Sequence, residues 1–380
     1  LLSQGIHSAA AWADAAVLIP WKLYLHYADR RILERQYAGM KSWIDFMTAH
    51  AENGIWNYQL QFGDWLALDA KEGSYFGATP NELTCTAYYA YSTGIFARVA
   101  DILEHREDAV KYQKLYEEIR SVFKTNFFGT DGMMTADTQT AYALALCFDL
   151  VPDQWKTGAA DRLAGLLEQN DGHMTTGFMG TPCLCPALSA QEKTKEAYRL
   201  LLRTDYPSWL YQVSQGATTV WEHLDGKKPD GNMWSADMNS FNHYAYGAVG
   251  EWLFETAAGI RICEENPGFR RILICPEICE ELGNVEASCS SPYGDIEVRW
   301  ECEEDQVTLE VQIPHNTTAQ IRLNNVTELI EAKGCSRQKA NFRTINEVIK
   351  EAGGSKEKAE RIDLEAGSGV HRIQYRVSQI

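Results

Sequence analysis

Apolar residues recur at three- and four-residue spacing along most of the first 257 residues, which is the period of an amphipathic helix. The segment "SAAAWADAAVLIPWKLYLHY" shows this spacing from residue 8, and "DRRILERQYAGMKSWIDFMTAH" repeats it after Asp29, a favoured helix cap. The pattern predicts about eight or nine helices. The other helical stretches lie at residues 79–103, 107–128, 135–150, 153–170, 189–204 and 240–260.

Long loops rich in glycine and aromatic residues separate some of these helices, at residues 53–78, 171–187 and 216–239. Short turns on one side and long loops on the other favour a barrel of helical hairpins, with its functional site on the long-loop side. A closed (α/α)6 barrel has twelve helices. The count therefore predicts that about three or four helices are absent from the N-terminal side of the barrel.

The pattern changes after Gly259, where apolar and polar residues alternate and turn residues divide the segments, as in "RRILICPE", "GDIEVRWE" and "GVHRIQYRV". We therefore expect a mainly α protein with a β domain. Residues 1–258 form a partial (α/α)6-barrel domain in this prediction, and residues 259–380 form a small antiparallel β-sandwich. The charged stretch near 325–363 is expected to be an insertion between strands.

Composition narrows the classes of partner. A net charge of −17 argues against nucleic acid and against anionic membrane surfaces, both of which need a basic protein face. No apolar run reaches the ~18 to 20 residues of a membrane span. The 11 Trp and 18 Tyr fit a carbohydrate binder, because the apolar faces of sugars stack on aromatic rings.

The ten cysteines show no disulfide rhythm, and "CLC" and "CPEIC" lack the spacing and histidines of a zinc site. We expect reduced thiols, a reducing compartment such as the cytoplasm, and neither metal nor cofactor. The chain starts at Leu1, and its first segment lacks the basic start of a signal peptide. It is therefore expected to be a piece of a longer protein.

Several loop residues are suited to sugar recognition. In "QFGDWLALD", Asp64 stands beside Trp65, so that a ring could stack on a pyranose while a carboxylate accepts hydroxyl hydrogen bonds. The alternative is a helix cap followed by a core tryptophan. Trp12 and Asp14 form a similar pair in "AAAWADAA". His243 opens a helix in "SFNHYAYG", where a purely structural histidine is the alternative.

Glu222 follows Trp221 in "GATTVWEHLDG". The uncharged stretch before it is expected to be buried, so the glutamate should lie at the mouth of the core. Burial beside a ring raises the pKa of a carboxyl toward the range of a general acid or base. The alternative is a solvated glutamate on an acidic surface.

Taken together, these stretches resemble the bacterial α-L-rhamnosidases of glycoside hydrolase family 78. The similar segments run in the family's order and cover most of residues 8–300. They include "SAAAWADAAVLIPWKLYLHY", "GDWLALD", "TTGFMGTPCLCPALS", "GATTVWEHLDG", "NSFNHYAYGAVGEWLFETAAGI" and "SPYGDIEVRWE".

The resemblance implies an (α/α)6 barrel followed by a β-sandwich, and hydrolysis of a terminal α-L-rhamnoside or oligosaccharide with inversion. Inversion needs an acid and a base whose carboxyls stand roughly 6.5–9.5 Å apart, so that a water fits between base and sugar. By resemblance Glu222 is the general base and His243 hydrogen-bonds the sugar. The expected sugar-binding residues are Trp12, Trp65, His243, Asp64, Asp14 and Trp221.

The sequence departs from the family's pattern in two ways. Ala11 and Ala13 stand where the family usually has glycines around the first tryptophan. The family's general acid lies in an upstream segment resembling Asp-Glu-Arg-Leu-Gly-Trp-Thr-Gly-Asp, and nothing like it occurs in this chain. We therefore expect a fragment of a rhamnosidase that lacks the acid. The alternatives are a non-catalytic rhamnoside- or glycan-binding protein, or a different (α/α)6 glycosidase or lyase.

Overall fold

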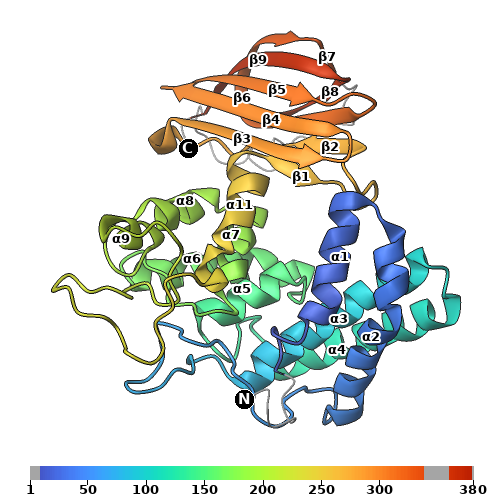
Figure 1. Ribbon diagram of the computed structural model, residues 1–380, viewed down its shortest axis with the longest axis vertical. Helices are drawn as coiled ribbons and strands as arrows, with labels where there is room; N and C mark the ends of the chain where they lie inside the picture. Colours follow the sequence, from blue (N-terminus) through green and yellow to red (C-terminus); the bar gives the residue numbers. More distant parts are fainter. Residues whose placement is uncertain (1–8, 338–358, 379–380) are drawn as a thin grey trace. The chain divides into compact units, whose positions relative to one another are not determined.

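The computed structural model describes residues 9–337 and 359–378, and the chain divides into two compact units. The first unit comprises Leu1–Lys22 and Arg30–Val249, and the second comprises Leu23–Asp29 and Gly250–Ile380. The first is helical and the second is mainly β (Figure 1). The predicted fold class, a helical hairpin region followed by a β domain, is confirmed.

Three helices of the first unit are buried on nearly every face: α3 (Asn81–Ile102), α5 (Gln139–Cys147) and α7 (Thr181–Ala190). Every residue of α5 except Cys147 is buried. A helix that is apolar all round belongs in a protein interior. These three are therefore the inner helices of the barrel.

Each inner helix pairs with an outer helix that follows it after a short turn. The outer helices are α4 (Arg106–Phe127), α6 (Lys156–Gln169) and α8 (Thr194–Leu202). They bury one stripe and expose the rest, the pattern of an amphipathic surface helix. The remaining helical segments of the described residues are α1 (Ala15–Tyr27), α2 (Arg30–His50), α9 (Trp209–Ser214), α10 (Tyr244–Gly247), α11 (Val249–Trp252), a π-helical turn at Leu253–Ala257 and 3-10 turns at Asp153–Trp155 and Glu280–Leu282.

The long connections precede the inner helices, at residues 51–80, 128–138 and 170–180, and a fourth loop at 215–243 precedes α10. Because each hairpin returns through a short turn, the starts of the inner helices lie at one end of the unit. Loops 51–80 and 215–243 extend from that end in Figure 1.

The sequence prediction of a loop over 171–187 is wrong in its second half, where α7 begins at Thr181. Pro182 lies in the first helical turn, where its missing N–H costs nothing. Pro186 removes one internal hydrogen bond. Burial of the apolar side chains on both sides of it offsets this loss, so the helix continues to Ala190.

The β unit has nine strands among the described residues, in the order β1-β2-β6-β9-β5-β4-β3, with β8 on β6 and β7 on β8. All pairs are antiparallel except β2 with β6. The strands are β1 (Ile260–Ile262), β2 (Arg271–Ile274), β3 (Asn284–Ser291), β4 (Gly294–Glu303), β5 (Gln306–Ile313), β6 (Thr318–Lys333), β7 (Cys335–Arg337), β8 (Glu360–Ala366) and β9 (Gly369–Val377).

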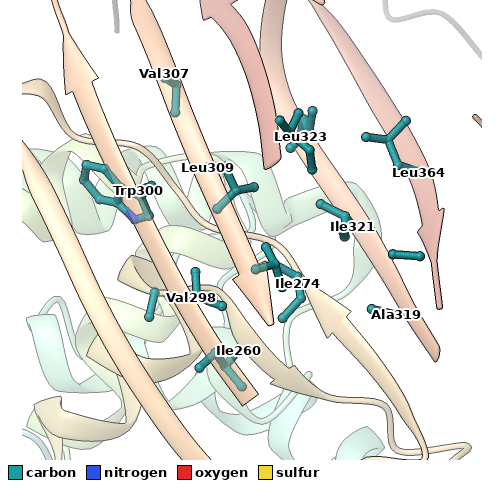
Figure 2. Close-up of a cluster of buried hydrophobic side chains, with 14 of the residues drawn as sticks. Ile260, Ile274, Val298, Trp300, Val307, Leu309, Ala319, Ile321, Leu323 and Leu364 are labelled. Atoms are coloured by element: carbon teal, nitrogen blue, oxygen red, sulfur yellow. The ribbon is translucent and has the colours of Figure 1, made fainter. Parts of the chain in front are cut away.

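Strand β6 belongs to both halves of this unit. Its first part pairs with β2 and β8, and after a register shift between Leu323 and Val326 its second part pairs with β9. Inward-facing residues of both halves form one buried cluster (Figure 2). The cluster includes Ile274, Ile321 and Leu364 from one half and Val298, Trp300 and Leu309 from the other. The predicted sandwich is therefore built from one continuous sheet whose two halves share β6 and enclose the buried cluster.

The middle of the predicted charged insertion, residues 338–358, lies outside the described residues. Its flanks are regular structure, since β6 and β7 lead into it and β8 follows it. No helix in the described ranges is long and apolar enough to cross a membrane.

Candidate active site

Trp12 lies in a turn before α1. The expected helix from residue 8 begins only at Ala15, because Ala11 takes a left-handed conformation with φ of 69°. The Ala11 N–H donates to Asp14 Oδ2 at 2.8 Å, which closes the turn. The Trp12 ring is 41% exposed and packs edge-on against Phe62, with ring centroids 5.0 Å apart. The turn thus presents Trp12 outward.

Asp14 itself is fully buried. Its Oδ1 accepts from Trp43 Nε1 at 2.8 Å and from Ser92 Oγ at 2.5 Å. Burial raises the pKa of this carboxyl, and the donated hydrogen bonds oppose that rise. Its contacts are with protein groups, so it positions the Trp12 turn, and the expected contact of Asp14 with a sugar stays a prediction.

Asp64 is also buried and joins two loops. Its Oδ1 accepts from the backbone N–H of Met179 (2.8 Å) and Gly180 (3.0 Å), and its Oδ2 accepts from Gly177 N–H (2.8 Å) and the Thr140 hydroxyl. Burial raises the pKa of Asp64 against the effect of these four donors. The carboxylate therefore fastens loop 51–80 to the start of α7, and its expected sugar contact also stays a prediction.

Trp65 is half-buried and lies at the centre of an aromatic group. Its ring is 5.6 Å from Phe62, 5.2 Å from Tyr75 and 5.3 Å from Phe76, measured between centroids. Its carbonyl oxygen accepts from Phe178 N–H at 2.9 Å. Since the Phe62 ring also packs against Trp12, the two predicted sugar-stacking tryptophans belong to one aromatic group.

Glu222 forms hydrogen bonds with the returning segment of its own loop. Its N–H donates to the Ser240 carbonyl at 2.8 Å, and its Oε2 accepts from Ser240 N–H at 2.9 Å. The side chain keeps 13% of its surface exposed, and Oε1 lies 4.0 Å from His243 Nε2. One carboxylate oxygen is therefore fixed by the backbone, while the other faces an imidazole.

The two ring nitrogens of His243 face two different groups. Nδ1 accepts from Ala245 N–H at 3.3 Å and so caps α10, which leaves the proton of a neutral ring on Nε2, toward Glu222. The ring also lies 4.8 Å from that of Phe178. Through Phe178, whose N–H binds Trp65, the glutamate and histidine are connected to the aromatic group.

Trp221 is buried in the base of the same loop. Its backbone N–H donates to Gln212 Oε1 at 3.0 Å, and its ring packs edge-on against Phe241. A Cβ on Gly226 would lie 3.2 Å from the Trp221 ring, so the loop is closely packed there. This is a supporting position for Glu222, and contact of Trp221 with a sugar stays a prediction.

His223 continues the loop into a short hairpin that returns at Trp234. The two rings stack with centroids 3.6 Å apart, and burial lowers the pKa of His223 to about 4. Trp234 in turn lies 6.1 Å from Tyr75 of loop 51–80. The loop that carries Glu222 and the loop that carries Trp65 therefore meet through side-chain rings.

Asp69 closes the segment that carries Tyr75 and Phe76. Its Oδ1 accepts from Ala78 N–H at 2.9 Å. Burial, with the charge of Asp64 nearby, raises the pKa of Asp69 to about 6. Proton release from this carboxyl is therefore shifted toward neutral pH.

The structure thus connects Trp12, Trp65, His243 and Glu222, whereas Asp14, Asp64 and Trp221 bind protein groups behind them. Ring faces can hold a sugar, and a carboxylate with one oxygen that the backbone does not hold can take a proton from a water. Sequence reasoning missed the residues through which these side chains contact one another, which are Phe62, Tyr75, Phe76, Phe178, His223, Trp234 and Ser240. The paired aromatic residues of "GSYFG" were a signal that could have identified Tyr75 and Phe76. Within 9–337 and 359–378, no group of three or more His, Cys, Asp or Glu could hold a metal ion.

Comparison with known proteins finds a family match for two consecutive parts of the chain. Residues 2–257 match the bacterial alpha-L-rhamnosidase 6 hairpin glycosidase domain, and residues 259–336 match the bacterial alpha-L-rhamnosidase C-terminal domain. An alpha-L-rhamnosidase of Streptomyces avermitilis is 39% identical over 315 residues, covering 83% of this chain and 29% of the relative. One from an Alteromonas species is 37% identical over 318 residues, covering 82% of this chain and 34% of that protein.

Solved structures agree with the sequence matches. The Streptomyces avermitilis alpha-L-rhamnosidase complexed with L-rhamnose superposes with a TM-score of 0.80 at 35% identity, covering 96% of this chain and 33% of that one. The Aspergillus terreus enzyme gives a TM-score of 0.84 at 32% identity, covering 98% of this chain and 40% of the fungal one. The chain spans 29% and 34% of the length of the two curated relatives above.

Proposed function

Because this chain belongs to the bacterial α-L-rhamnosidase six-hairpin glycosidase family, we propose that the protein hydrolyses terminal α-L-rhamnosides. The observation that carries the proposal is the hold on Glu222, which has one oxygen fixed by Ser240 N–H and the other directed to His243. This carboxylate lies in a loop that contacts the aromatic group of Trp65. The bound L-rhamnose of the Streptomyces relative supports rhamnose as the sugar.

In the proposed mechanism Glu222 is the general base of an inverting hydrolysis. A water hydrogen-bonded to Oε1 gives its proton to Glu222 as its oxygen attacks the anomeric carbon. The Ser240 N–H keeps Oε2 in place, so the carboxylate is oriented before the sugar arrives. His243 Nε2–H donates to a hydroxyl of the sugar; without a sugar, Nε2 lies 4.0 Å from Oε1, too far for a hydrogen bond.

Two tryptophans hold the rhamnose ring in this proposal. Trp12 and Trp65 stack on its apolar faces, and the ring of Phe62 packs against both tryptophans. Asp14 and Asp64 act by fixing the turns that present these rings, and Trp221 by supporting the backbone of Glu222. We assign this catalytic part to residues 1–258 and the β-sandwich to residues 259–380.

The general acid that protonates the leaving oxygen is proposed to lie outside residues 1–380. No segment of this chain resembles the acid motif of the family, and the chain corresponds to about a third of its relatives. The 380-residue chain alone is then expected to show no appreciable hydrolysis of rhamnosides.

The test is hydrolysis of an aryl α-L-rhamnoside by the complete natural protein, by its Glu222→Gln variant and by the 380-residue chain. Glutamine keeps an oxygen for Ser240 N–H but accepts no proton, so kcat should fall by about 10²- to 10⁴-fold. Proton NMR should show β-L-rhamnose as the first anomer released.

The matched control is Asp237→Asn, which neutralises an exposed carboxylate of the same loop and should leave kcat unchanged. Equal rates for the natural protein and Glu222→Gln would contradict the role of Glu222. Turnover by the 380-residue chain would contradict the missing acid. Rhamnose binding by the complete protein without turnover would favour the glycan-binding alternative.

A further inference from the structure

Segments 73–77 and 233–234, from two loops, carry large apolar side chains that are exposed or half-buried. Tyr75 and Phe76 are each 41% exposed, and Met233 is 54% exposed. Trp234 is half-buried and contacts Tyr75. We call these four residues the aromatic rim. Exposed apolar groups gathered from separate loops commonly mark a binding site.

The aromatic rim is continuous with both parts of the proposed active site. Tyr75 and Phe76 pack on Trp65, the proposed rhamnose platform. Trp234 stacks on His223, the residue next to the proposed base Glu222. A group attached to a rhamnose on Trp65 would therefore meet the aromatic rim as it extends into solvent.

The rim is also held in shape before any ligand binds. Leu66 N–H donates to the Tyr75 carbonyl at 2.7 Å, and Gly77 N–H donates to the Asp64 carbonyl at 3.1 Å. On the other loop, Trp234 N–H donates to the Gly226 carbonyl at 3.1 Å. A pre-formed surface loses little conformational entropy on binding, which favours affinity.

The chemistry of the rim favours a flat apolar ligand over a second sugar. Segment 73–77, "GSYFG", has no charged side chain, and the Ser74 hydroxyl already accepts from Phe76 N–H at 3.0 Å. The side chains of Met233 and Trp234 add no carboxylate or amide group. A pyranose needs such polar partners for its hydroxyls, whereas an aromatic ring needs ring faces and edges.

We propose that the aromatic rim is a specificity site that binds the leaving group of rhamnosides with an aromatic aglycone. This inference rests on the proposed function, because the rim acts on a substrate whose rhamnose occupies the site beside it. Tyr75 and Trp234 contact the aglycone ring, and they set affinity for the aglycone without contacting the reacting atoms.

The test measures binding to the complete natural protein carrying Glu222→Gln, which slows turnover by about 10²- to 10⁴-fold. Dissociation constants of 2-naphthyl and methyl α-L-rhamnoside are obtained by calorimetry. Tyr75→Ala should weaken naphthyl rhamnoside binding by about three- to tenfold, the size of one aromatic contact, and leave methyl rhamnoside unchanged. Tyr75→Phe keeps the ring and should restore the affinity. Tyr293→Ala, a tyrosine with 40% exposure in the β unit, should change neither constant.

Three results would overturn the inference. An equal loss for both ligands would make Tyr75 part of the rhamnose site, and no loss for either would make the rim inert. A larger loss for a rhamnosyl-glucoside than for the naphthyl ligand would indicate a sugar site. If the protein with Tyr75 intact binds neither rhamnoside, the proposed function fails too, a result distinct from failure of the aglycone site alone.

Discussion

Ala11 holds a backbone conformation that L-residues other than glycine adopt at a cost. With φ of 69° it lies in the left-handed region, and its N–H closes the Trp12 turn on Asp14. The left-handed conformation costs an alanine about 1–2 kcal/mol. The turn therefore stores strain that a glycine would remove.

Ala11→Gly is expected to stabilise the helical unit. The relief of strain is partly cancelled by the greater freedom of glycine in the unfolded chain, which leaves a net gain of about 0.5–1 kcal/mol. Urea unfolding followed by helical circular dichroism measures the difference. Ala13→Gly is the control, since Ala13 is not strained in this way and its replacement should destabilise by about 0.5–1 kcal/mol. Equal effects of the two substitutions would contradict the strain.

Individual residues show where sequence reasoning reaches its limit. The sequence offered His243 as either a structural or a sugar-binding histidine, and one ring nitrogen caps a helix while the other faces Glu222. Asp64 and Glu222 looked alike as carboxylates beside tryptophans. Their difference comes from residues 113 to 116 positions away in sequence that donate to Asp64, which no local pattern could reveal.

At the scale of elements, the site depends on two loops that approach backbone to backbone. A Cβ on Gly177 would lie 2.4 Å from the Trp65 carbonyl oxygen and 2.6 Å from Ala67 N. Backbone atoms on both sides leave no flexible group to move away. The start of α7 can therefore meet the Trp65 loop only if residue 177 has no side chain.

Gly177→Ala is expected to force these loops apart, with a loss of about 1–3 kcal/mol in stability from overpacking. Because Asp64 would lose the Gly177 donor, rhamnoside hydrolysis by the complete protein should fall as well. Thermal unfolding and kcat/KM measure the two effects.

Gly158→Ala is the matched control. Gly158 lies inside α6, and a Cβ added there would have no neighbouring atom within 4 Å, so alanine should raise stability by up to about 1 kcal/mol through helix propensity. A Gly177→Ala protein as stable and active as the natural one would show that the loops can separate freely.

The helices were predictable to the extent that packing follows periodicity. The inner and outer helices of the hairpin α3 and α4 were expected close to their true bounds, because long periodic stretches dominate local signals. Helix α7 was missed because two prolines and a run of small residues are typical of a loop. Its stability comes from burial among neighbouring helices, a tertiary effect that local sequence does not carry.

At the scale of the whole molecule, the β unit includes a segment far away in sequence. Leu23–Asp29 belongs to it, since Gly268 N–H donates to the Leu25 carbonyl at 2.7 Å and the ring of His26 lies 6.0 Å from that of Phe269. The boundary at residue 258 predicted from sequence stays a proposal. A cut there would separate this segment from the strands.

A fragment of residues 259–380 is therefore expected to be less stable than the same strands in the whole chain. It would expose Phe269 and leave the Gly268 N–H without its carbonyl, a loss of about 2–4 kcal/mol. Hydrogen–deuterium exchange of β2 peptides, compared between fragment and chain, measures the difference. Equal protection would mean that Leu23–Asp29 adds nothing to the unit.

The hydrogen bond from the Ser240 backbone N–H to Glu222 has a consequence for how such a site can evolve. The donor is a main-chain N–H, which every amino acid except proline supplies, and the Ser240 side chain is exposed. A substitution at position 240 other than proline therefore keeps the donor to Glu222, although it removes the hydrogen bonds of the Ser240 hydroxyl with the Asn242 backbone. Selection can therefore adjust this contact only indirectly, through residues such as Ser240 and Asn242 that set the path of the loop.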